Sequence, residues 1–268
     1  MGRRRTTSLA SLLIIGLAFG PSVVAQDVVG TAQPPDDWDY GEDPARKLSI
    51  AAVTFDNFGV AVRCMDGSLS VVLSGLPVAT GTRQVRYRMG DSEETGGEWI
   101  SGRDSTAAFS VWPRFVAAGM SRGGRLSMKV PDGERMRQYA VDLPASEASI
   151  TRVFSNCGHD LEASRADTAP SREDLTGLVW RRSPEPSFPS RTNYEIGLAG
   201  ITCQVRDNGR LRDCSVESEF PEGSGFGRAA TYGAHRTGQV ALADGATSGM
   251  ADRRISFLVR YQALDWHD

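Results

Sequence analysis

Residues 200–216 read Gly-Ile-Thr-Cys-Gln-Val-Arg-Asp-Asn-Gly-Arg-Leu-Arg-Asp-Cys-Ser-Val, two alternating runs on either side of Asn208-Gly209. Asn-Gly between alternating hydrophobic residues is the strongest short-range signal of a β-hairpin. A two-residue type I′ turn at this point would place Cys203 opposite Cys214. Because the alternation slips in the second run, a bulge near Arg212-Asp213 remains an alternative.

Two further elements are predicted after this hairpin. Small and aromatic residues recur at helical spacing from Phe226 to Gly233, which predicts a short helix. A strand is expected over residues 255–261. One of its faces holds Ile255, Phe257, Val259 and Tyr261, and the other holds Ser256, Leu258 and Arg260. The predicted order of elements in residues 191–264 is therefore β-β-α-β.

Residues 48–162 are predicted to form a separate domain made mostly of antiparallel strands. Asp66-Gly67 lies between two alternating runs and indicates another hairpin. Short helices are expected at residues 112–118 and 146–157. We therefore expect an α+β protein, with an N-terminal mostly antiparallel β domain and a small C-terminal β-β-α-β domain.

The N-terminus has the features of a secretory signal peptide. Arg3-Arg4-Arg5 precedes a mostly apolar stretch from Leu9 to Phe19, and a cleavage site is expected after Ala25. This stretch is shorter than the roughly 20 residues that span a bilayer. The mature protein is therefore expected in the periplasm without a membrane span. The alternative is that the stretch is retained as an anchor.

The net charge is distributed unevenly along the rest of the chain. Removing residues 1–25, which hold three arginines and no acidic residue, takes the net charge from −3 to −6. Residues 26–47 hold six acidic residues in their first part and are expected to form a flexible arm, with Trp38 and Tyr40 packing on the chain's own domain. Proline and serine in residues 163–190 indicate a linker. The balanced body carries no basic run, which argues against a nucleic acid partner.

The four cysteines are expected to form two disulfides in an oxidising compartment. The hairpin places Cys203 beside Cys214, within disulfide range. Cys64 and Cys157 then remain for each other, which would close the N-terminal domain. A redox pair is less well supported, because neither pair has close spacing at a helix N-terminus.

A family resemblance is carried by the runs 200–205 and 208–216 and by the helix around Phe226-Gly-Arg-Ala-Ala230. Together they resemble the C-terminal domain of TonB-family proteins over about residues 174–264. The resemblance implies a β-β-α-β domain whose last strand pairs with a segment of an outer-membrane receptor, which assigns a partner-binding edge to Ser256, Leu258 and Arg260. The chain departs from an energy transducer because it lacks a long proline-rich spacer.

The motifs that could indicate a catalytic, phosphate-binding or metal-binding site match their patterns poorly. Ser121 lies in Gly119-Met-Ser-Arg-Gly123, which matches the GxSxG pattern of hydrolases, but a strand is expected after it and a helix before it, the reverse of that motif. Gly223-Ser-Gly-Phe-Gly227 is only loosely similar to a phosphate loop and is expected to cap a helix. The three histidines do not show metal-ligand spacing, and no metal or cofactor is expected.

We therefore expect a periplasmic, non-catalytic protein-interaction protein that binds an extended peptide of an envelope or outer-membrane protein by strand addition. The alternative for this edge is that it is covered by the N-terminal domain or by a second copy of the chain in a homodimer. The alternatives are a periplasmic serine hydrolase that uses Ser121, and a membrane-anchored TonB-type energy transducer for outer-membrane transport.

Overall fold

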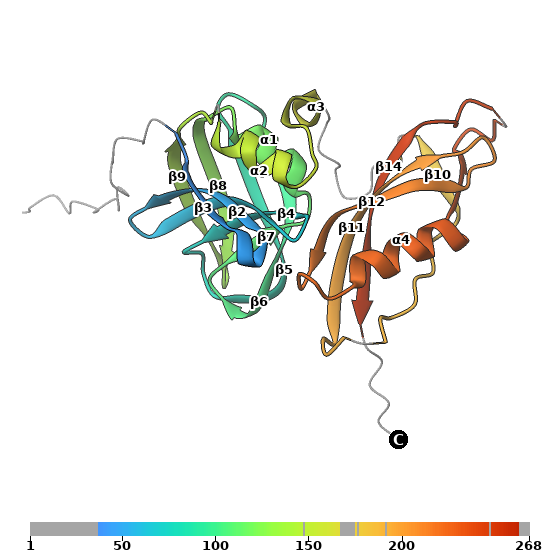
Figure 1. The fold of residues 1–268 in the computed structure, drawn as a ribbon, viewed down its shortest axis with the longest axis horizontal. Helices are drawn as coiled ribbons and strands as arrows, with labels where there is room; N and C mark the ends of the chain where they lie inside the picture. The colour runs from blue at the N-terminus through green and yellow to red at the C-terminus, as the bar shows by residue number, and fades with distance from the viewer. Residues whose placement is uncertain are drawn as a thin grey trace, which may run out of the picture.

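The structure is a computed structural model that describes residues 37–146, 148–166, 175, 177–190, 192–246 and 248–262. Two units lie side by side (Figure 1): an N-terminal unit, residues 37–166, and a C-terminal unit, residues 177–262. The predicted signal peptide, most of the predicted arm (residues 26–36) and residues 167–174 of the predicted linker lie outside the described residues.

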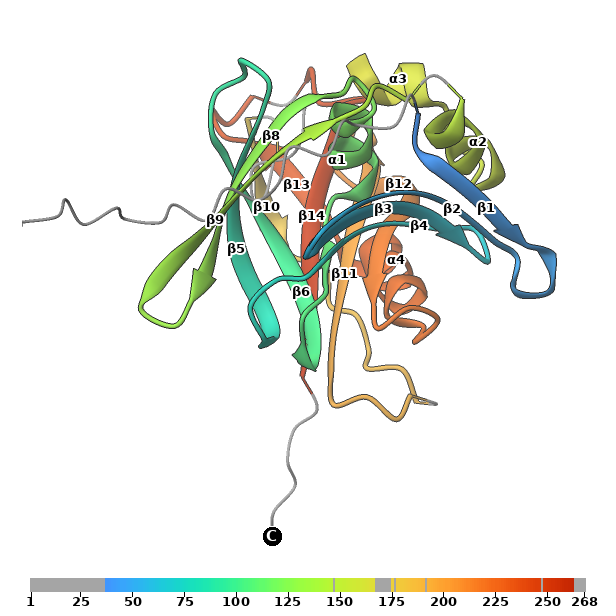
Figure 2. The same cartoon turned by 90° about the vertical axis from the view of Figure 1, so that its left-hand side faces the viewer.

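One antiparallel sheet of nine strands forms the N-terminal unit, in the order β1-β2-β3-β4-β7-β6-β5-β8-β9. Its strands are β1 (Asp39–Asp43), β2 (Leu48–Phe55), β3 (Phe58–Met65), β4 (Ser68–Ser74), β5 (Ala79–Met89), β6 (Thr95–Ser105), β7 (Ala108–Ser110), β8 (Gly124–Asp132) and β9 (Arg135–Leu143). The helical elements are the 3₁₀ turn η1 (Pro44–Arg46), α1 (Pro113–Met120), α2 (Ser149–Asn156) and α3 (Leu161–Ala166). Figure 2 shows strands β1 to β4 crossing the strands of the other half of the sheet at an angle.

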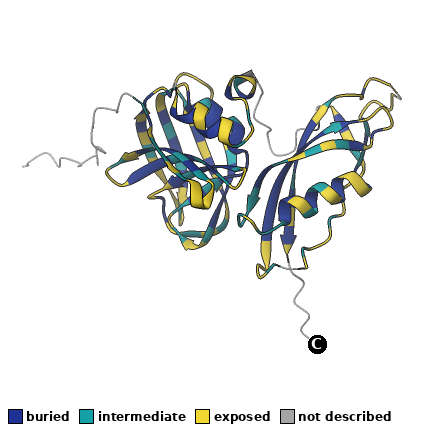
Figure 3. Ribbon diagram, in the orientation of Figure 1, coloured by how far each residue is buried: buried dark blue, intermediate teal, exposed yellow. Residues whose placement is uncertain are grey.

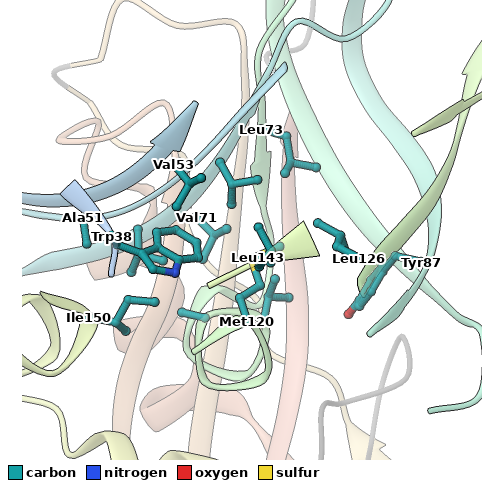
Figure 4. Close-up of a cluster of buried hydrophobic side chains, with 14 of the residues drawn as sticks. Trp38, Ala51, Val53, Val71, Leu73, Tyr87, Met120, Leu126, Leu143 and Ile150 are labelled. Carbon is teal, nitrogen blue, oxygen red and sulfur yellow. The ribbon is translucent and has the colours of Figure 1, made fainter. Parts of the chain in front are cut away.

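The sheet folds over onto itself, so its two ends enclose a single core. The Phe58 ring on β3 lies 5.1 Å from the Tyr139 ring on β9, measured between centroids. The Trp38 indole N–H donates a hydrogen bond to the carbonyl of Pro144, just after β9. Buried side chains from both halves of the sheet and from the helices fill the space between them (Figure 4).

Trp38 fixes the beginning of the described chain. Its side chain is only 2% exposed, and the Ser149 hydroxyl donates to its carbonyl at 2.7 Å. Tyr40 packs against the same core, with the Arg152 guanidinium 3.9 Å from its ring centroid. The acidic segment is therefore part of the sheet from Asp39 onward, where the sequence had indicated a flexible arm, because these two aromatic side chains dock on the N-terminal unit.

The C-terminal unit contains a three-stranded antiparallel sheet in the order β12-β11-β14 and a separate two-stranded sheet, β10-β13. Its elements are β10 (Leu178–Arg182), β11 (Ile196–Val205), β12 (Leu211–Phe220), α4 (Phe226–Thr237), β13 (Gln239–Leu242) and β14 (Arg254–Gln262). Helix α4 covers one face of the three-stranded sheet (Figure 1) and buries Phe226, Ala230 and Ala234 against it. Figure 3 shows β11, the central strand, as buried over most of its length.

The expected α+β class is wrong. The structure is 52% strand and 17% helix, and the nine-stranded sheet dominates it. The C-terminal unit is also not a β-β-α-β domain, because β10 and β13 add a second small sheet. Strand β10 lies in the stretch predicted as a linker, where Leu178 is nevertheless buried and Trp180 packs edge-on against Phe257 of β14. Strand β13 follows α4 directly and is only four residues long.

The hairpin at Asn208-Gly209 forms with a different turn from the one predicted. A type I′ turn needs a positive φ at both residues, and only Gly209 has one, at +76°. The turn is closed by the Gly209 N–H, which donates to Arg206 O at 2.9 Å. Strand β13 packs against this turn: Val240 N–H donates to Gly209 O, and a Cβ on Gly209 would lie 2.0 Å from Val240 O.

Candidate functional site

Strand β14 was predicted to carry the partner-binding edge, and its two faces have different surroundings. Ile255, Phe257, Val259 and Tyr261 are buried against the core of the C-terminal unit. Burial raises the pKa of Tyr261, and the nearby Glu219 adds to the effect. The hydroxyl therefore stays protonated and donates to Phe226 O at 3.0 Å, which fixes β14 to the start of α4.

The opposite face holds the three predicted site residues, and the structure places their side chains in contacts within the protein. The Ser256 hydroxyl lies 2.8 Å from that of Thr202 on β11. Leu258 packs on a small cluster of buried residues that both units share. Arg260 donates to both carboxylate oxygens of Glu98 on β6, at 2.9 and 2.7 Å. What β14 leaves for a partner is therefore its backbone edge.

The N-terminal unit packs on the face of the three-stranded sheet opposite α4, where Leu198 and Leu258 join Ile100, Val111 and Trp112 in one cluster. From β12, the Ser218 hydroxyl donates to Val111 O at 2.6 Å, and Arg63 of β3 pairs with Glu222 just beyond the strand at 2.6 Å. The N-terminal unit therefore contacts all three strands on one face of the sheet, through Ser218, Leu198 and Arg260. Strand β14 pairs with β11 on one side, and within the described ranges no strand pairs with its other side. The outer edge of β14 is therefore unpaired among the described residues.

A buried ion pair stabilises the contact between the units, which we call the interdomain joint. Arg114 of α1 donates from Nε and Nη2 to the two carboxylate oxygens of Glu217 on β12, at 3.0 and 3.2 Å. These side chains are only 8% and 3% exposed. The apolar part of the joint consists of Ile100, Val111, Trp112 and Leu198.

Sequence reasoning missed this joint, although one signal of it is visible. Arg114 stands alone among apolar residues in Trp112-Pro-Arg-Phe-Val-Ala-Ala118. A charged residue is seldom fully buried unless it is paired, so an arginine within an apolar helix indicates a buried partner. Nothing in the local pattern identifies Glu217 as that partner.

Ser121, the nucleophile of the hydrolase alternative, is held in a structural role. Its side chain is 1% exposed and its hydroxyl donates to Ala118 O at 2.9 Å. Arg165 of α3 donates to the same oxygen from Nε and Nη2, at 3.1 and 2.9 Å. A nucleophilic serine needs a base within hydrogen-bond reach and access to substrate. Ser121 instead ties α3 to the end of α1.

The glycine-rich segment before α4 borders an open hollow of about 600 Å³. One wall is the extended segment 187–190, with Phe188, and the other is formed by residues 223–225 and by α4, with Arg228 and Tyr232. The helix N-terminus itself is already occupied, because the Gly227 N–H donates to the Glu219 carboxylate at 2.8 Å. We call this hollow the α4 groove.

Both expected disulfides are present. Cys64 of β3 is bonded to Cys157 at the end of α2, and Cys203 of β11 is bonded to Cys214 of β12. Ile201 lies opposite Val216, in the same register as the predicted pairing of Cys203 with Cys214, but the register shifts before Gln204, which lies opposite Arg212. The bulge considered near Arg212-Asp213 is therefore real.

The histidines do not form a site. Burial lowers the pKa of His159, and its ring lies edge-on to Phe154 with 6.4 Å between centroids. His235 is exposed on α4, and His267 lies outside the described residues. No group of three or more potential metal ligands occurs in the described part of the chain.

Among the residues that the structure covers, no helix is long and apolar enough to cross a membrane.

Comparison with known proteins gives no relative from which a function could be transferred. No family model, no curated protein and no solved structure matches the chain. The functional argument therefore rests on the geometry of the two units.

Proposed function

We propose that this protein is a periplasmic, non-catalytic interaction protein that binds an extended peptide of an envelope or outer-membrane protein along the open edge of β14. A strand edge presents a row of backbone N–H and C=O groups that an added strand can satisfy. The observation that carries the proposal is the edge of β14: the strand is nine residues long, pairs with β11 on one side and, among the described residues, has no strand on its other side.

The contacts on both faces of β14 support the proposal, because they hold the strand in a fixed position. The strand is nine residues long, and both of its faces are anchored, one by the core under α4 and the other by Leu258 and by the Arg260–Glu98 pair. A partner strand therefore meets a rigid edge, which lowers the ordering cost of binding. The resemblance to TonB-family C-terminal domains agrees with this use of the last strand.

The compartment is part of the same proposal. The predicted signal peptide and the two disulfides agree with an oxidising environment such as the periplasm. With β14 as the binding edge, the three predicted site residues have supporting roles: Ser256, Leu258 and Arg260 hold the strand in place from behind.

Photo-crosslinking in cells tests where a partner binds. A photoreactive residue at Gln262, exposed at the end of β14, should form adducts with an envelope protein. The matched control is Gln138, exposed on β9 at the edge of the other sheet. Leu258→Pro removes a backbone N–H within β14 and should abolish the adduct, whereas Arg260→Ala should keep it. Adducts from Gln262 that match those from Gln138, or that survive Leu258→Pro in a correctly bridged protein, would contradict the proposal.

The crosslinked partner segment then allows a test of strand addition itself. The segment is synthesised and its affinity measured with single alanine replacements and with single N-methylated amides. Because main-chain hydrogen bonds are worth about 1 kcal/mol each, N-methylation at alternate positions should weaken binding by about fivefold. Side-chain truncation at most positions should matter less. A peptide whose affinity depends only on its side chains binds in another way.

A further inference from the structure

The α4 groove has walls that packing within the C-terminal unit holds in place. The Phe188 ring lies edge-on against the rings of Phe226 and Tyr261, with 5.4 and 6.0 Å between centroids. The segment that carries Phe188 is tied to the end of α4, because the Glu185 N–H donates to the Thr237 hydroxyl at 2.8 Å. The groove is therefore preformed, which lowers the ordering cost of binding.

One end of the groove carries a positive charge. The Arg228 guanidinium lies beside the backbone of Gly225, since a Cβ built on that glycine would be 3.8 Å from Arg228 Nη2. No acidic residue lines the groove, and no acidic side chain in the described part of the chain forms an ion pair with Arg228. The Glu219 carboxylate accepts from the Gly227 N–H instead. The charge of Arg228 is therefore available to an anionic ligand.

A hydroxyl at the same end also points to a ligand. Ser224 lines the groove next to Gly225, and its Oγ is buried without a hydrogen-bond partner among the described residues. A buried polar atom without a partner costs free energy, so such atoms are rare in folded proteins. A ligand oxygen beside Arg228 supplies the missing acceptor once the Ser224 side chain rotates about its Cα–Cβ bond.

The rest of the lining is apolar or neutral. Phe188 and Tyr232 are 37% and 62% exposed on opposite walls, and Ser187 and Ser190 add neutral hydrogen-bonding groups. Tyr232 follows Arg228 by one turn of α4, so the aromatic walls begin next to the positive charge. The volume of about 600 Å³ lies within the range typical of ligand sites. These properties fit a ligand that carries a carboxylate beside an apolar group.

We infer that the α4 groove binds the free C-terminus of a peptide whose last side chain is apolar. The terminal carboxylate pairs with Arg228 and accepts from the Ser224 hydroxyl, and the last side chain lies between Phe188 and Tyr232. A C-terminal residue carries its carboxylate and its side chain on the same carbon, which matches the position of the charge beside the aromatic walls. Capture of a C-terminal carboxylate is a recurring mode of peptide recognition.

Fluorescence anisotropy with the full secreted, disulfide-bonded chain tests this inference. The probe is the tripeptide Ala-Ala-Phe with fluorescein on its N-terminus, made with a free C-terminal carboxylate or with an amide. The free acid should bind about tenfold more tightly than the amide, because hydrogen bonds to charged groups are the stronger ones. Arg228→Met should remove this preference, and Arg228→Lys should keep part of it.

Ser224→Ala separates a binding role from a structural one. It should weaken binding of the free acid by about threefold or more and leave Tm unchanged, because its hydroxyl has no partner in the fold that could be lost. The matched control is Arg206→Met, an exposed arginine at the β11-β12 turn, which should change neither affinity.

Three results would overturn the inference: no binding of the free acid at millimolar concentration, equal affinities for acid and amide, or a preference that Arg228→Met leaves intact. A further probe, Ala-Asp-Phe with a C-terminal amide, carries its carboxylate within the chain. If it binds as tightly as the free acid, the groove binds acidic side chains and the C-terminal assignment is wrong. None of these variants changes β14, so the strand-addition proposal is tested separately.

Discussion

Replacing Glu217 with glutamine tests whether the interdomain joint contributes to the stability of the whole protein. The change keeps the side-chain shape but removes the negative charge of Glu217 from beside the Arg114 guanidinium, which is 8% exposed. Removing one partner of a buried ion pair typically costs 3–5 kcal/mol. Because Arg114 keeps its cation–π contact with Phe115, we expect about 3 kcal/mol. For a protein of this size, that lowers Tm by about 6–12 °C.

Urea unfolding of the disulfide-bonded protein measures this effect. The matched control is Asp142→Asn, which breaks an ion pair with Arg125 that is more than half exposed on both sides. Such pairs contribute at most about 1 kcal/mol. Replacing both members of the buried pair, Arg114→Met with Glu217→Leu, should recover most of the loss, because apolar side chains of similar volume need no counter-charge.

Two results would refute this reasoning. If Glu217→Gln costs no more than Asp142→Asn, the Arg114–Glu217 pair is not buried in solution and the units do not pack as described. If the double replacement is as unstable as the single one, the loss comes from another part of the joint and not from an unpaired charge.

Two further predictions concern the disulfides and pH. Because the closed loops span 93 and 11 residues, replacing Cys64 and Cys157 with serine should lower the free energy of unfolding by about 2 kcal/mol more than replacing Cys203 and Cys214, as measured by urea unfolding; equal losses would contradict a chain-entropy origin. Burial lowers the pKa of His159 in the folded state, so the unfolded chain binds a proton more readily and stability should fall as pH drops below about 6.5. His159→Gln should reduce this fall in thermal unfolding scans, and an unchanged slope would count against it.

Elements with a local signal were predictable from the sequence. Alternation over residues 255–261 predicted β14 and its two faces, and the small-residue spacing from Phe226 predicted α4. The short helix expected at residues 112–118 is α1. Each of these signals lies within one element, so it does not depend on where the rest of the chain goes.

Elements specified by distant contacts were missed. Strand β6 reads Thr-Gly-Gly-Glu-Trp-Ile-Ser-Gly-Arg-Asp-Ser, with three glycines and several polar residues that are rare in strands. It forms because Trp99 and Ile100 are buried and because β5 and β7 pair on either side of it. The fold class was therefore wrong, since the size of the nine-stranded sheet depends on pairings that no short window shows.

For the candidate site, the sequence predicted the strand and its two faces but not the contacts around them. Alternation placed Ser256, Leu258 and Arg260 on one face, and the structure agrees. What covers that face depends on Glu98, 162 residues earlier in the chain, so no local pattern indicates it. That the outer edge of β14 has no paired strand among the described residues also depends on how distant segments pair, so no local pattern indicates it.

The interdomain joint also has a consequence for the time course of synthesis. Arg114 and Glu217 are separated by 103 residues. At 5–20 residues per second, the ribosome needs about 5 to 20 s to make the intervening chain. A nascent chain that has passed Trp112 therefore presents Ile100, Val111 and Trp112 without their covering strand for that interval. Slower translation lengthens the interval in which these apolar side chains are open to other chains, so yield should depend on expression temperature.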